Sequence, residues 1–225
     1  MKQLLSISFG LSLLLIGCIG DDLIFDEVDE AVRILNPLDT LAVGEMYQFE
    51  TLFTNNVGKE EERPVVWTSS DAAVLGIDEN GLCTALAKGT CTVTATVEIP
   101  GEPSVSDSFD LVVDEETVVA ENKKSGTIKS TSSYALQGTF EITESGDGIL
   151  ISINDDYQAT TILPALYVYL GNNPSSIGDA FEIQAVEVFQ GAHTYQVDGV
   201  GINDYQYILY WCKPFGVKVG EGLIE

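Results

Sequence analysis

The stretch Tyr205-Gln-Tyr-Ile-Leu-Tyr-Trp-Cys-Lys-Pro-Phe215 is the densest aromatic run in this chain. Read with the two-residue period of a β-strand, both of its faces are largely apolar. A strand half exposed to solvent would alternate apolar and polar residues, so this stretch predicts a central strand covered on both sides. Pro214 cannot donate a hydrogen bond to a neighbouring strand, and we expect regular pairing to weaken there. The C-terminal part of the protein should be built around this strand.

The rest of the chain carries the same β signature. Short apolar runs are separated by turn signals such as Asp78–Gly81, and no helix-length amphipathic pattern is present. Leu82–Leu86 and Thr90–Val97 are expected to form the two arms of one hairpin. Ala185–Phe189 is expected to be a further strand. The predicted fold class is all-β, with two β-sandwich-like domains in tandem.

The N-terminus has the features of an export signal. Lys2 supplies a weak positive start, and residues 11–16 form an apolar run too short for a bilayer, which needs roughly 20 apolar residues. Leu15-Ile16-Gly17-Cys18 resembles the lipobox of bacterial lipoproteins. The resemblance implies a signal peptide at residues 1–17 and a lipid on Cys18, which anchors the protein to a membrane. The alternative is an ordinary secretory signal with an incidental cysteine, which also exports the protein.

Residues 18–30 are expected to be an acidic tether. Asp21 and Asp22 follow shortly after the cysteine and resemble the surface-export signal of Bacteroidota lipoproteins. That resemblance implies a location at the bacterial outer membrane, on the cell surface.

The chain is strongly acidic, with 35 Asp and Glu against 10 Lys and Arg and a formal net charge of −25. Such a surface repels phosphate backbones, which proteins bind through Lys and Arg, so nucleic acid is excluded as a partner. The simplest interpretation of the acids is a well-solvated surface. No Asp-x-Asp-x-Asp-Gly calcium loop and no zinc-type cluster is present, so no metal ligand is assigned.

Four motifs follow one another between residues 31 and 114, namely Leu41–Glu45, Val66–Asp71, Asp78–Leu82 and Ala85–Thr90. Together they resemble the group-two bacterial immunoglobulin-like domain over essentially the whole segment. Such domains are mostly spacers and adhesion modules of surface proteins. A charged stretch at residues 115–125 is the expected linker to a second domain.

Residues 126–225 resemble the DM-thirteen domain, a small β domain found beside DOMON-type cytochrome domains in electron-transfer proteins. The resemblance rests on Gly126, Gly138, Asp155–Tyr157, Pro164–Leu170 and Tyr210–Phe215. It implies a redox role for Cys212, as a bare thiol or as the ligand of a prosthetic group, with Tyr210 and Trp211 as its neighbours. The cofactor is left as haem or none. The sequence departs from the pattern at Ser132–Tyr134, where many members have a histidine.

The other cysteines leave two alternatives. Cys83 and Cys91 lie symmetrically in the expected hairpin, where they could form a disulfide in an exported protein. They could equally be two small buried thiols. Cys212 then has no partner, and the alternative to a redox role is an inert thiol buried by apolar neighbours.

No catalytic residue is assigned, and the protein is not expected to be an enzyme. His193 is the single histidine, and no Gly-x-Ser-x-Gly motif is present. The first hypothesis is an exported, lipid-anchored envelope or surface protein with a redox or prosthetic-group domain acting through Cys212, with an envelope redox partner. The second is a non-enzymatic adhesion or ligand-binding surface lipoprotein in which Cys212 is structural.

Overall fold

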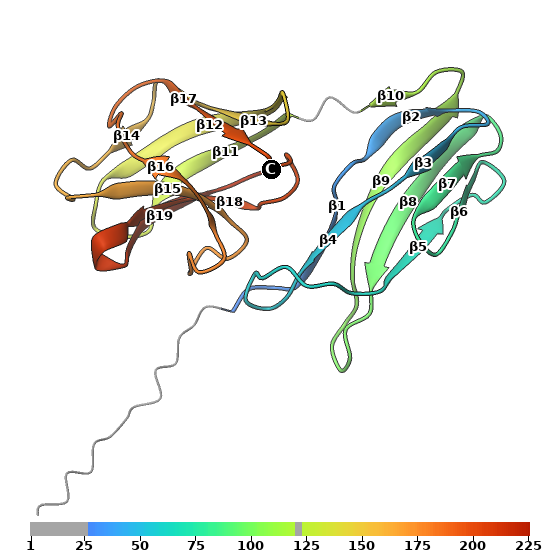
Figure 1. Cartoon of the computed structure of the whole chain (residues 1–225), viewed down its shortest axis with the longest axis horizontal. Helices are drawn as coiled ribbons and strands as arrows, with labels where there is room; N and C mark the ends of the chain where they lie inside the picture. The colour runs from blue at the N-terminus through green and yellow to red at the C-terminus, as the bar shows by residue number, and fades with distance from the viewer. Residues whose placement is uncertain (1–26, 120–122) are drawn as a thin grey trace, which may run out of the picture.

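The computed structural model describes residues 27–119 and 123–225 and confirms the all-β fold class (Figure 1). The described chain forms an N-terminal unit (residues 27–119) and a C-terminal unit (residues 123–225) that lie side by side. Within these ranges no helix has the length and apolar character needed to cross a membrane. A short 3-10 helix, η1 (Lys213–Phe215), interrupts the strands of the C-terminal unit.

The N-terminal unit is a sandwich. A five-stranded sheet in the order β10-β2-β9-β8-β5 packs against the smaller sheets β1-β4 and β3-β7-β6, with Val93, Leu111 and Leu75 fully buried between them. β10 lies within the range expected as a linker and pairs with β2, which ties it to this unit. The strands are β1 (Ala31–Ile34), β2 (Leu38–Ala42), β3 (Met46–Gln48), β4 (Thr51–Thr54), β5 (Val65–Ser69), β6 (Leu75–Ile77), β7 (Leu82–Ala85), β8 (Gly89–Val97), β9 (Val105–Asp114) and β10 (Val118–Val119).

The predicted hairpin between β7 and β8 is wrong. β7 pairs with β3 and β6, whereas β8 pairs with β5 and β9, so the two strands belong to different sheets. Both strands have a buried face that contributes to one core, which they can share from opposite layers of the sandwich. The turn at Asp78–Gly81 is confirmed, and Gly81 adopts a positive φ of 82° there.

The C-terminal unit is one continuous sheet curled around its main core. Its strand order is β16-β15-β18-β19-β11-β12-β13-β17, with β14 pairing β12, and both ends of the sheet supply core residues. The strands are β11 (Lys123–Ser130), β12 (Leu136–Ser145), β13 (Gly148–Ile153), β14 (Gln158–Ala159), β15 (Leu166–Gly171), β16 (Phe181–Ala185), β17 (His193–Asp198), β18 (Tyr207–Cys212) and β19 (Val217–Leu223).

β18 confirms the predicted central strand. It pairs with β15 on one side and β19 on the other, and all of its residues after Tyr207 are buried. The strand ends at Cys212 and η1 follows with Pro214, as expected from the missing N–H. The strand predicted at Ala185–Phe189 is wrong, because β16 ends at Ala185. The next residues leave the sheet, and the N–H of Val186 bonds to Leu166.

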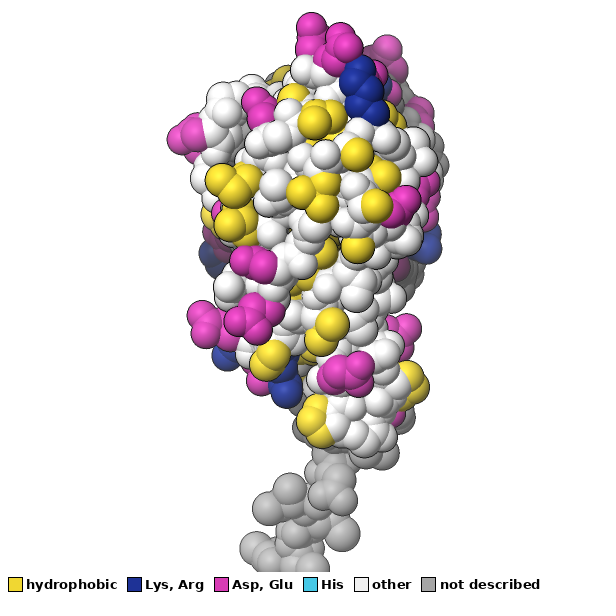
Figure 2. Space-filling view, turned by 90° about the vertical axis from the view of Figure 1, so that its right-hand side faces the viewer, with side chains coloured by type: hydrophobic (Ala, Val, Ile, Leu, Met, Phe, Trp, Pro, Cys, Tyr) yellow, Lys and Arg dark blue, Asp and Glu magenta, His cyan; other side chains and the backbone are white. Residues whose placement is uncertain are grey.

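Exposed apolar side chains are scattered over the surface among acidic ones. Figure 2 shows this mixture on the side where the N-terminal unit lies. Met46 and Val119 are the most exposed large apolar residues of that unit, at 66% and 60% of their surface. Apolar side chains that are exposed one by one are normal for soluble surfaces.

Candidate functional site

Cys212 is sealed inside the C-terminal unit. Its strand neighbours are Leu166 on β15 and Val217 on β19, and none of its surface reaches solvent. The side chain joins the main core together with Ile208 and Tyr210, which share its face of β18. A soluble partner therefore cannot reach the thiol while the unit is folded.

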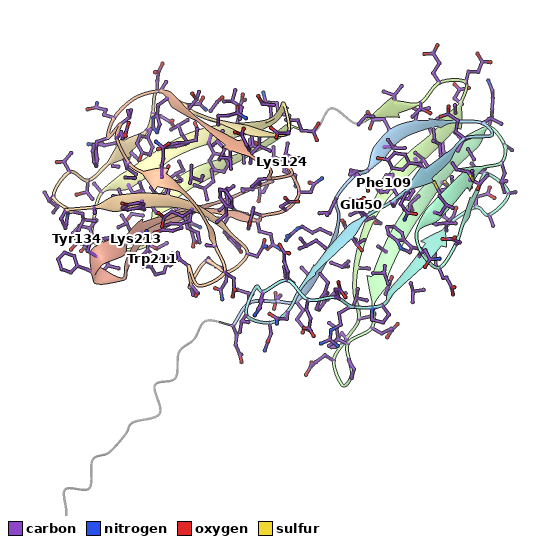
Figure 3. The ribbon with its side chains drawn as sticks, viewed as in Figure 1. Glu50, Phe109, Lys124, Tyr134, Trp211 and Lys213 are labelled. Atoms are coloured by element: carbon purple, nitrogen blue, oxygen red, sulfur yellow. The ribbon has the colours of Figure 1, made fainter. Side chains whose placement is uncertain are left out.

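The opposite face of β18 is also covered. Trp211 packs with Tyr169 and Leu209, and Ile177 and Ala180 from the segment between β15 and β16 lie against them. The cover of this face is thus a loop of the chain itself. Lys213, next to the thiol in sequence, turns outward: its ammonium group is 2.6 Å from Glu182 and 4.8 Å from the centre of the Tyr167 ring. Figure 3 shows Trp211 and Lys213 together at this end of the unit.

This packing does not fit a haem or another large prosthetic group at Cys212. The thiol has no exposed surface, and apolar side chains of the chain itself occupy the volume on its side of the strand. Among residues 27–119 and 123–225, no group of three or more His, Cys, Asp and Glu side chains is arranged to hold a metal ion.

His193 lies at the start of β17, an end strand of the sheet, and is half-buried. Its Nδ1 is 2.9 Å from the carbonyl oxygen of Gly191, and its Nε2 is 3.0 Å from the hydroxyl of Tyr195. A carbonyl oxygen can only accept, so Nδ1 carries the proton of the neutral ring. In that tautomer the Tyr195 hydroxyl donates to Nε2.

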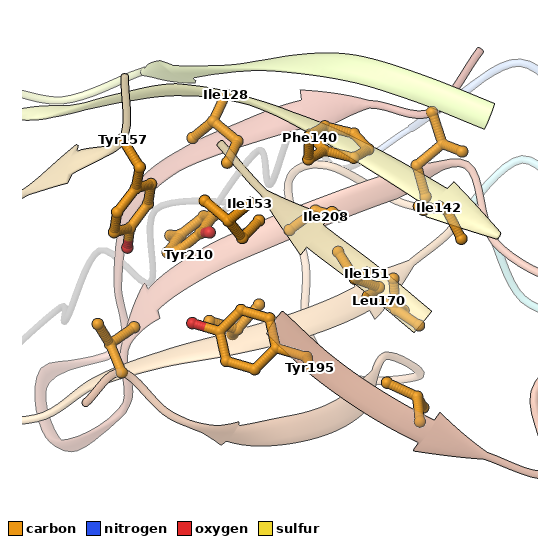
Figure 4. Close-up of a cluster of buried hydrophobic side chains, with 14 of the residues drawn as sticks. Ile128, Phe140, Ile142, Ile151, Ile153, Tyr157, Leu170, Tyr195, Ile208 and Tyr210 are labelled. Carbon is orange, nitrogen blue, oxygen red and sulfur yellow. The ribbon is translucent and has the colours of Figure 1, made fainter. Parts of the chain in front are cut away.

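Three phenols are buried beside this histidine. The hydroxyls of Tyr157, Tyr195 and Tyr210 turn toward one region of the interior (Figure 4). The ring of Tyr157 is 4.9 Å from that of His193 and 6.0 Å from that of Tyr210. Burial raises the pKa of Tyr157 to about 12, and it also raises the pKa values of Tyr195 and Tyr210. The three phenols therefore stay protonated to higher pH than a solvent-exposed tyrosine does.

Cys83 and Cys91 are buried free thiols in the core of the N-terminal unit. They lie on β7 and β8, in the two opposing layers, and not in the arms of one hairpin as predicted. Burial raises the pKa of both thiols, which lowers their reactivity in the folded state. Cys18, the predicted lipidation site, lies outside the described residues.

The contact between the two units is polar and centred on Arg33 of β1. Its Nε donates to the carbonyl of Asn203 at 2.9 Å, and its Nη2 donates to the carbonyl of Asp204 at 2.6 Å and to Oδ1 of Asn172 at 3.1 Å. The amide of Asn203 donates back to the carbonyl of Leu35 at 2.9 Å. These bonds join the edge of the first unit to two loops of the second.

A second contact strengthens this junction. Nδ2 of Asn173 donates to the carbonyl of Val57 at 2.9 Å. Lys124 lies on the side of its unit that faces the other one (Figure 3), and its pKa is lowered by burial and by Arg33, against the opposing effect of Asp107. Asn172, Asn173 and Asn203 are all buried, so the junction excludes water from its hydrogen bonds.

Sequence reasoning missed the junction and the pair formed by Tyr195 and His193. One signal for Arg33 was available, since it is one of only 10 basic residues in the chain and lies in an apolar tetrapeptide, Ala31–Ile34. The alternation of His193 and Tyr195 along β17 places them on one face, which is a local signal. Nothing local indicates that Tyr157 and Tyr210 join them.

Residues 30–109 match the family model of the bacterial Ig-like domain (group 2), and domains of this kind occur in surface or extracellular bacterial proteins. No curated protein matches the chain. The matched range covers most of the N-terminal unit, and its sandwich architecture agrees with an immunoglobulin-like fold.

Proposed function

We propose that this protein is an exported lipoprotein of the bacterial outer membrane, anchored through Cys18, that presents its two β units at the cell surface to bind a ligand. The observation that carries the proposal is the match of residues 30–109 to a bacterial Ig-like domain. The lipobox pattern that ends at Cys18 and the acidic residues after it support the anchor and the outward location. The role is non-enzymatic, and Cys212 is structural.

The proposed organisation is a signal peptide at residues 1–17, a tether at 18–30, the immunoglobulin-like domain at 31–114, a linker at 115–125 and a DM-thirteen-like domain at 126–225. The position of β10 argues for one adjustment. Its pairing with β2 attaches residues 118–119 to the first domain, which shortens the free part of the linker. A short linker and the polar junction at Arg33 both favour two domains that move as one body.

Binding is favoured over a redox role through Cys212 because of the burial of that thiol. A thiol that exchanges electrons or disulfides with a partner has to be reached by that partner. Cys212 has no exposed surface, and the other face of its strand is closed by Ile177 and Ala180. The envelope redox partner that the DM-thirteen resemblance implies would need the unit to open first.

The anchor and the location are tested together on intact cells that express the protein. Wild-type protein should partition with the outer membrane, take up a radiolabelled fatty acid and be cleaved by protease added outside the cells. Cys18→Ala should lose the label and leave the membrane fraction, and Cys212→Ala, the matched control, should keep both. Label on the Cys18→Ala protein would contradict the anchor, and full protection from external protease would contradict the surface location.

The binding role is tested separately with the soluble Cys18→Ala chain on arrays of envelope and host glycans and matrix proteins. Saturable binding by wild-type and Cys212→Ala chains alike supports a surface ligand with Cys212 structural. Binding or absorbance of a prosthetic group that disappears in Cys212→Ser would restore the redox hypothesis.

A further inference from the structure

Three loops of the C-terminal unit meet at the end that lies away from the N-terminal unit, which we call the loop end. The loop end consists of residues 131–135 between β11 and β12, 160–165 between β14 and β15, and 213–216 between β18 and β19. The N–H of Thr160 donates to the carbonyl of Ala135 at 2.8 Å. The N–H of Lys213 donates to the carbonyl of Ala165 at 3.3 Å. These bonds join the three loops into one surface, and Figure 3 shows Tyr134 and Lys213 on it.

The two most exposed large apolar side chains of the described residues lie on the loop end. Ile162 has 77% of its surface exposed, and Phe215 has 68%. Phe215 is the last residue of η1, and Gly216 follows it with a left-handed φ of 61°, which turns the chain sharply into β19. Exposed hydroxyl side chains, such as Ser133 and Thr161, accompany them on the same loops. Apolar side chains that are exposed together on adjoining loops mark a contact surface.

The loop end has no carboxylate, which sets it apart from the rest of this acidic chain. The chain has 35 Asp and Glu among 225 residues, yet none of them falls within these three loops. Lys213, the one charged residue there, has its ammonium group 2.6 Å from Glu182 of β16, so the surface is nearly neutral. A protein partner can pair carboxylates with its own Lys and Arg, whereas the interior of a bilayer penalises every charge. The absence of carboxylates therefore favours a lipid surface over a protein partner.

The proposed anchor would also keep the loop end near a bilayer. Residues 18–26 lie between the proposed lipid on Cys18 and Glu27, the first described residue, and they span roughly 30 Å at most when extended. Such a tether raises the local concentration of the bilayer and strengthens a contact that is weak by itself. This step rests on the proposed function, whereas the composition of the loop end does not depend on it.

We propose that the loop end is a bilayer contact, at which Ile162 and Phe215 insert into the boundary between lipid headgroups and acyl chains. Removal of these two side chains from water drives the contact. The Ser and Thr hydroxyls of the same loops lie at the level of the polar headgroups, and Lys213 stays paired with Glu182. In the anchored protein the C-terminal unit then rests on the bilayer, and the N-terminal unit lies on the side away from the loop end (Figure 1).

The test uses the mature Cys18→Ala chain, which carries no lipid, with vesicles of phosphatidylcholine. The chain should sediment with the vesicles, and binding should persist at high salt because salt screens charges and not apolar contacts. Ile162→Ser and Phe215→Ser should each lower the partition coefficient about tenfold, the factor that corresponds to burial of one such side chain. Met46→Ser is the matched change at an exposed apolar side chain of the N-terminal unit, and it should leave binding unchanged. The substituted side chains are all exposed, so each variant should unfold at the denaturant concentration of its parent.

A dye on the loop end measures insertion directly. Cys83, Cys91 and Cys212 are buried, so a maleimide dye reacts in the folded chain with a thiol introduced at an exposed position. Nitrobenzoxadiazole on Ser133→Cys should brighten on vesicles and should be quenched by lipids brominated on their acyl chains. The same dye on Ser104→Cys, at an exposed position of the N-terminal unit, should show neither change.

Three results would overturn the proposal. The first is no vesicle binding by the Cys18→Ala chain, or undiminished binding by both Ile162→Ser and Phe215→Ser. The second is binding that needs phosphatidylglycerol and is lost at high salt, which would assign the contact to Lys213. The third is self-association without vesicles that both serine variants abolish, which would make a second copy of the chain the occupant. No lipid anchor takes part in these measurements, so their failure and a failure of the anchor test are distinguishable.

Discussion

The two units of this protein share a fold class but treat their buried polar groups differently. In the N-terminal unit the main cluster of buried residues holds Leu, Val, Phe, Ala and Cys, and Tyr47 lies at its margin, with its hydroxyl directed at the carbonyl of Asn36. In the C-terminal unit three phenols, Tyr157, Tyr195 and Tyr210, lie inside the core itself. The first core holds two buried ionisable groups, the thiols of Cys83 and Cys91, whereas the second has to keep three phenols neutral.

A second contrast concerns the room around glycine residues in the two units. Glycines of the C-terminal unit allow the sheet to close tightly: a Cβ on Gly126 would lie 2.1 Å from the carbonyl oxygen of Leu223 and 2.4 Å from the Phe140 ring. Gly76, in a strand of the N-terminal unit, would meet only a methyl group of Leu86 at 3.6 Å, which is an ordinary contact. The curled sheet therefore tolerates a side chain at Gly126 less well than the sandwich does at Gly76.

The largest expected difference is that alkaline pH destabilises the C-terminal unit more than the N-terminal unit. Burial raises the pKa of Tyr157 from 10.0 to about 12 and raises those of Tyr195 and Tyr210. The unfolded chain therefore releases these phenolic protons at lower pH than the folded chain does. Stability is thus complete below pH 10 and falls as the pH rises toward 12 and beyond, at about 1.4 kcal/mol per pKa unit for each phenol.

Each unit carries one tryptophan, which makes this measurable. Fluorescence of Trp211 in Trp67→Phe should report denaturation at lower denaturant concentration as the pH rises above 10. Fluorescence of Trp67 in Trp211→Phe should change much less over the same range. A Trp67 transition that moves as far as the Trp211 transition would contradict the contrast between the cores.

The next effect is steric. Gly126→Ala should destabilise the C-terminal unit by about 3 kcal/mol or more, because its Cβ meets backbone as well as the Phe140 ring. Gly76→Ala, the matched change in the other unit, should alter the free energy of unfolding little. Urea denaturation followed by the unit-specific tryptophans checks both, and equal losses in the two variants would remove the difference in packing.

The junction should respond to Arg33→Ala. This change removes the Arg33 bonds across the junction and leaves the Asn203 carbonyl without its donor, whereas the Asp204 carbonyl keeps Nδ2 of Asn172; the expected cost is about 1–3 kcal/mol of contact between the units. Arg63→Ala is the control, since Arg63 pairs with Glu61 inside the N-terminal unit. Small-angle X-ray scattering should show a larger radius of gyration for Arg33→Ala and no change for Arg63→Ala. An unchanged profile for Arg33→Ala would show that the linker and the remaining junction bonds set the arrangement without Arg33.

The smallest effect concerns the thiols. Cys212→Ala should cost about 1 kcal/mol, as an ordinary loss of packing. In the soluble Cys18→Ala chain, Cys83, Cys91 and Cys212 should resist a maleimide until the protein is unfolded, and all three should then react without reductant because they are free. Reaction of Cys212 alone after unfolding would instead show a disulfide between the other two.

The sequence carried more information about strands than about their partners. The apolar faces of Tyr207–Cys212 and the missing N–H of Pro214 were enough to predict β18 and its end, since both are local properties. The same kind of local pattern wrongly predicted that the strands of Cys83 and Cys91 pair with each other in one hairpin. Two apolar strands joined by a short connection look alike whether they pair with each other or cross from one sheet to the other.

By itself, the sequence determined the all-β class, the central strand, the turn at Gly81 and the acidity of the surface, because periodicity, turn chemistry and charge are written in neighbouring residues. The tertiary structure decided what the functional candidates can do. In the folded protein Cys212 is buried, and Arg33 hydrogen-bonds to Asn203, 170 positions away along the chain. Tyr157 and Tyr210 lie beside Tyr195 and His193. Burial and proximity of this kind arise from the closure of a sheet between distant strands, and no local pattern specifies that closure.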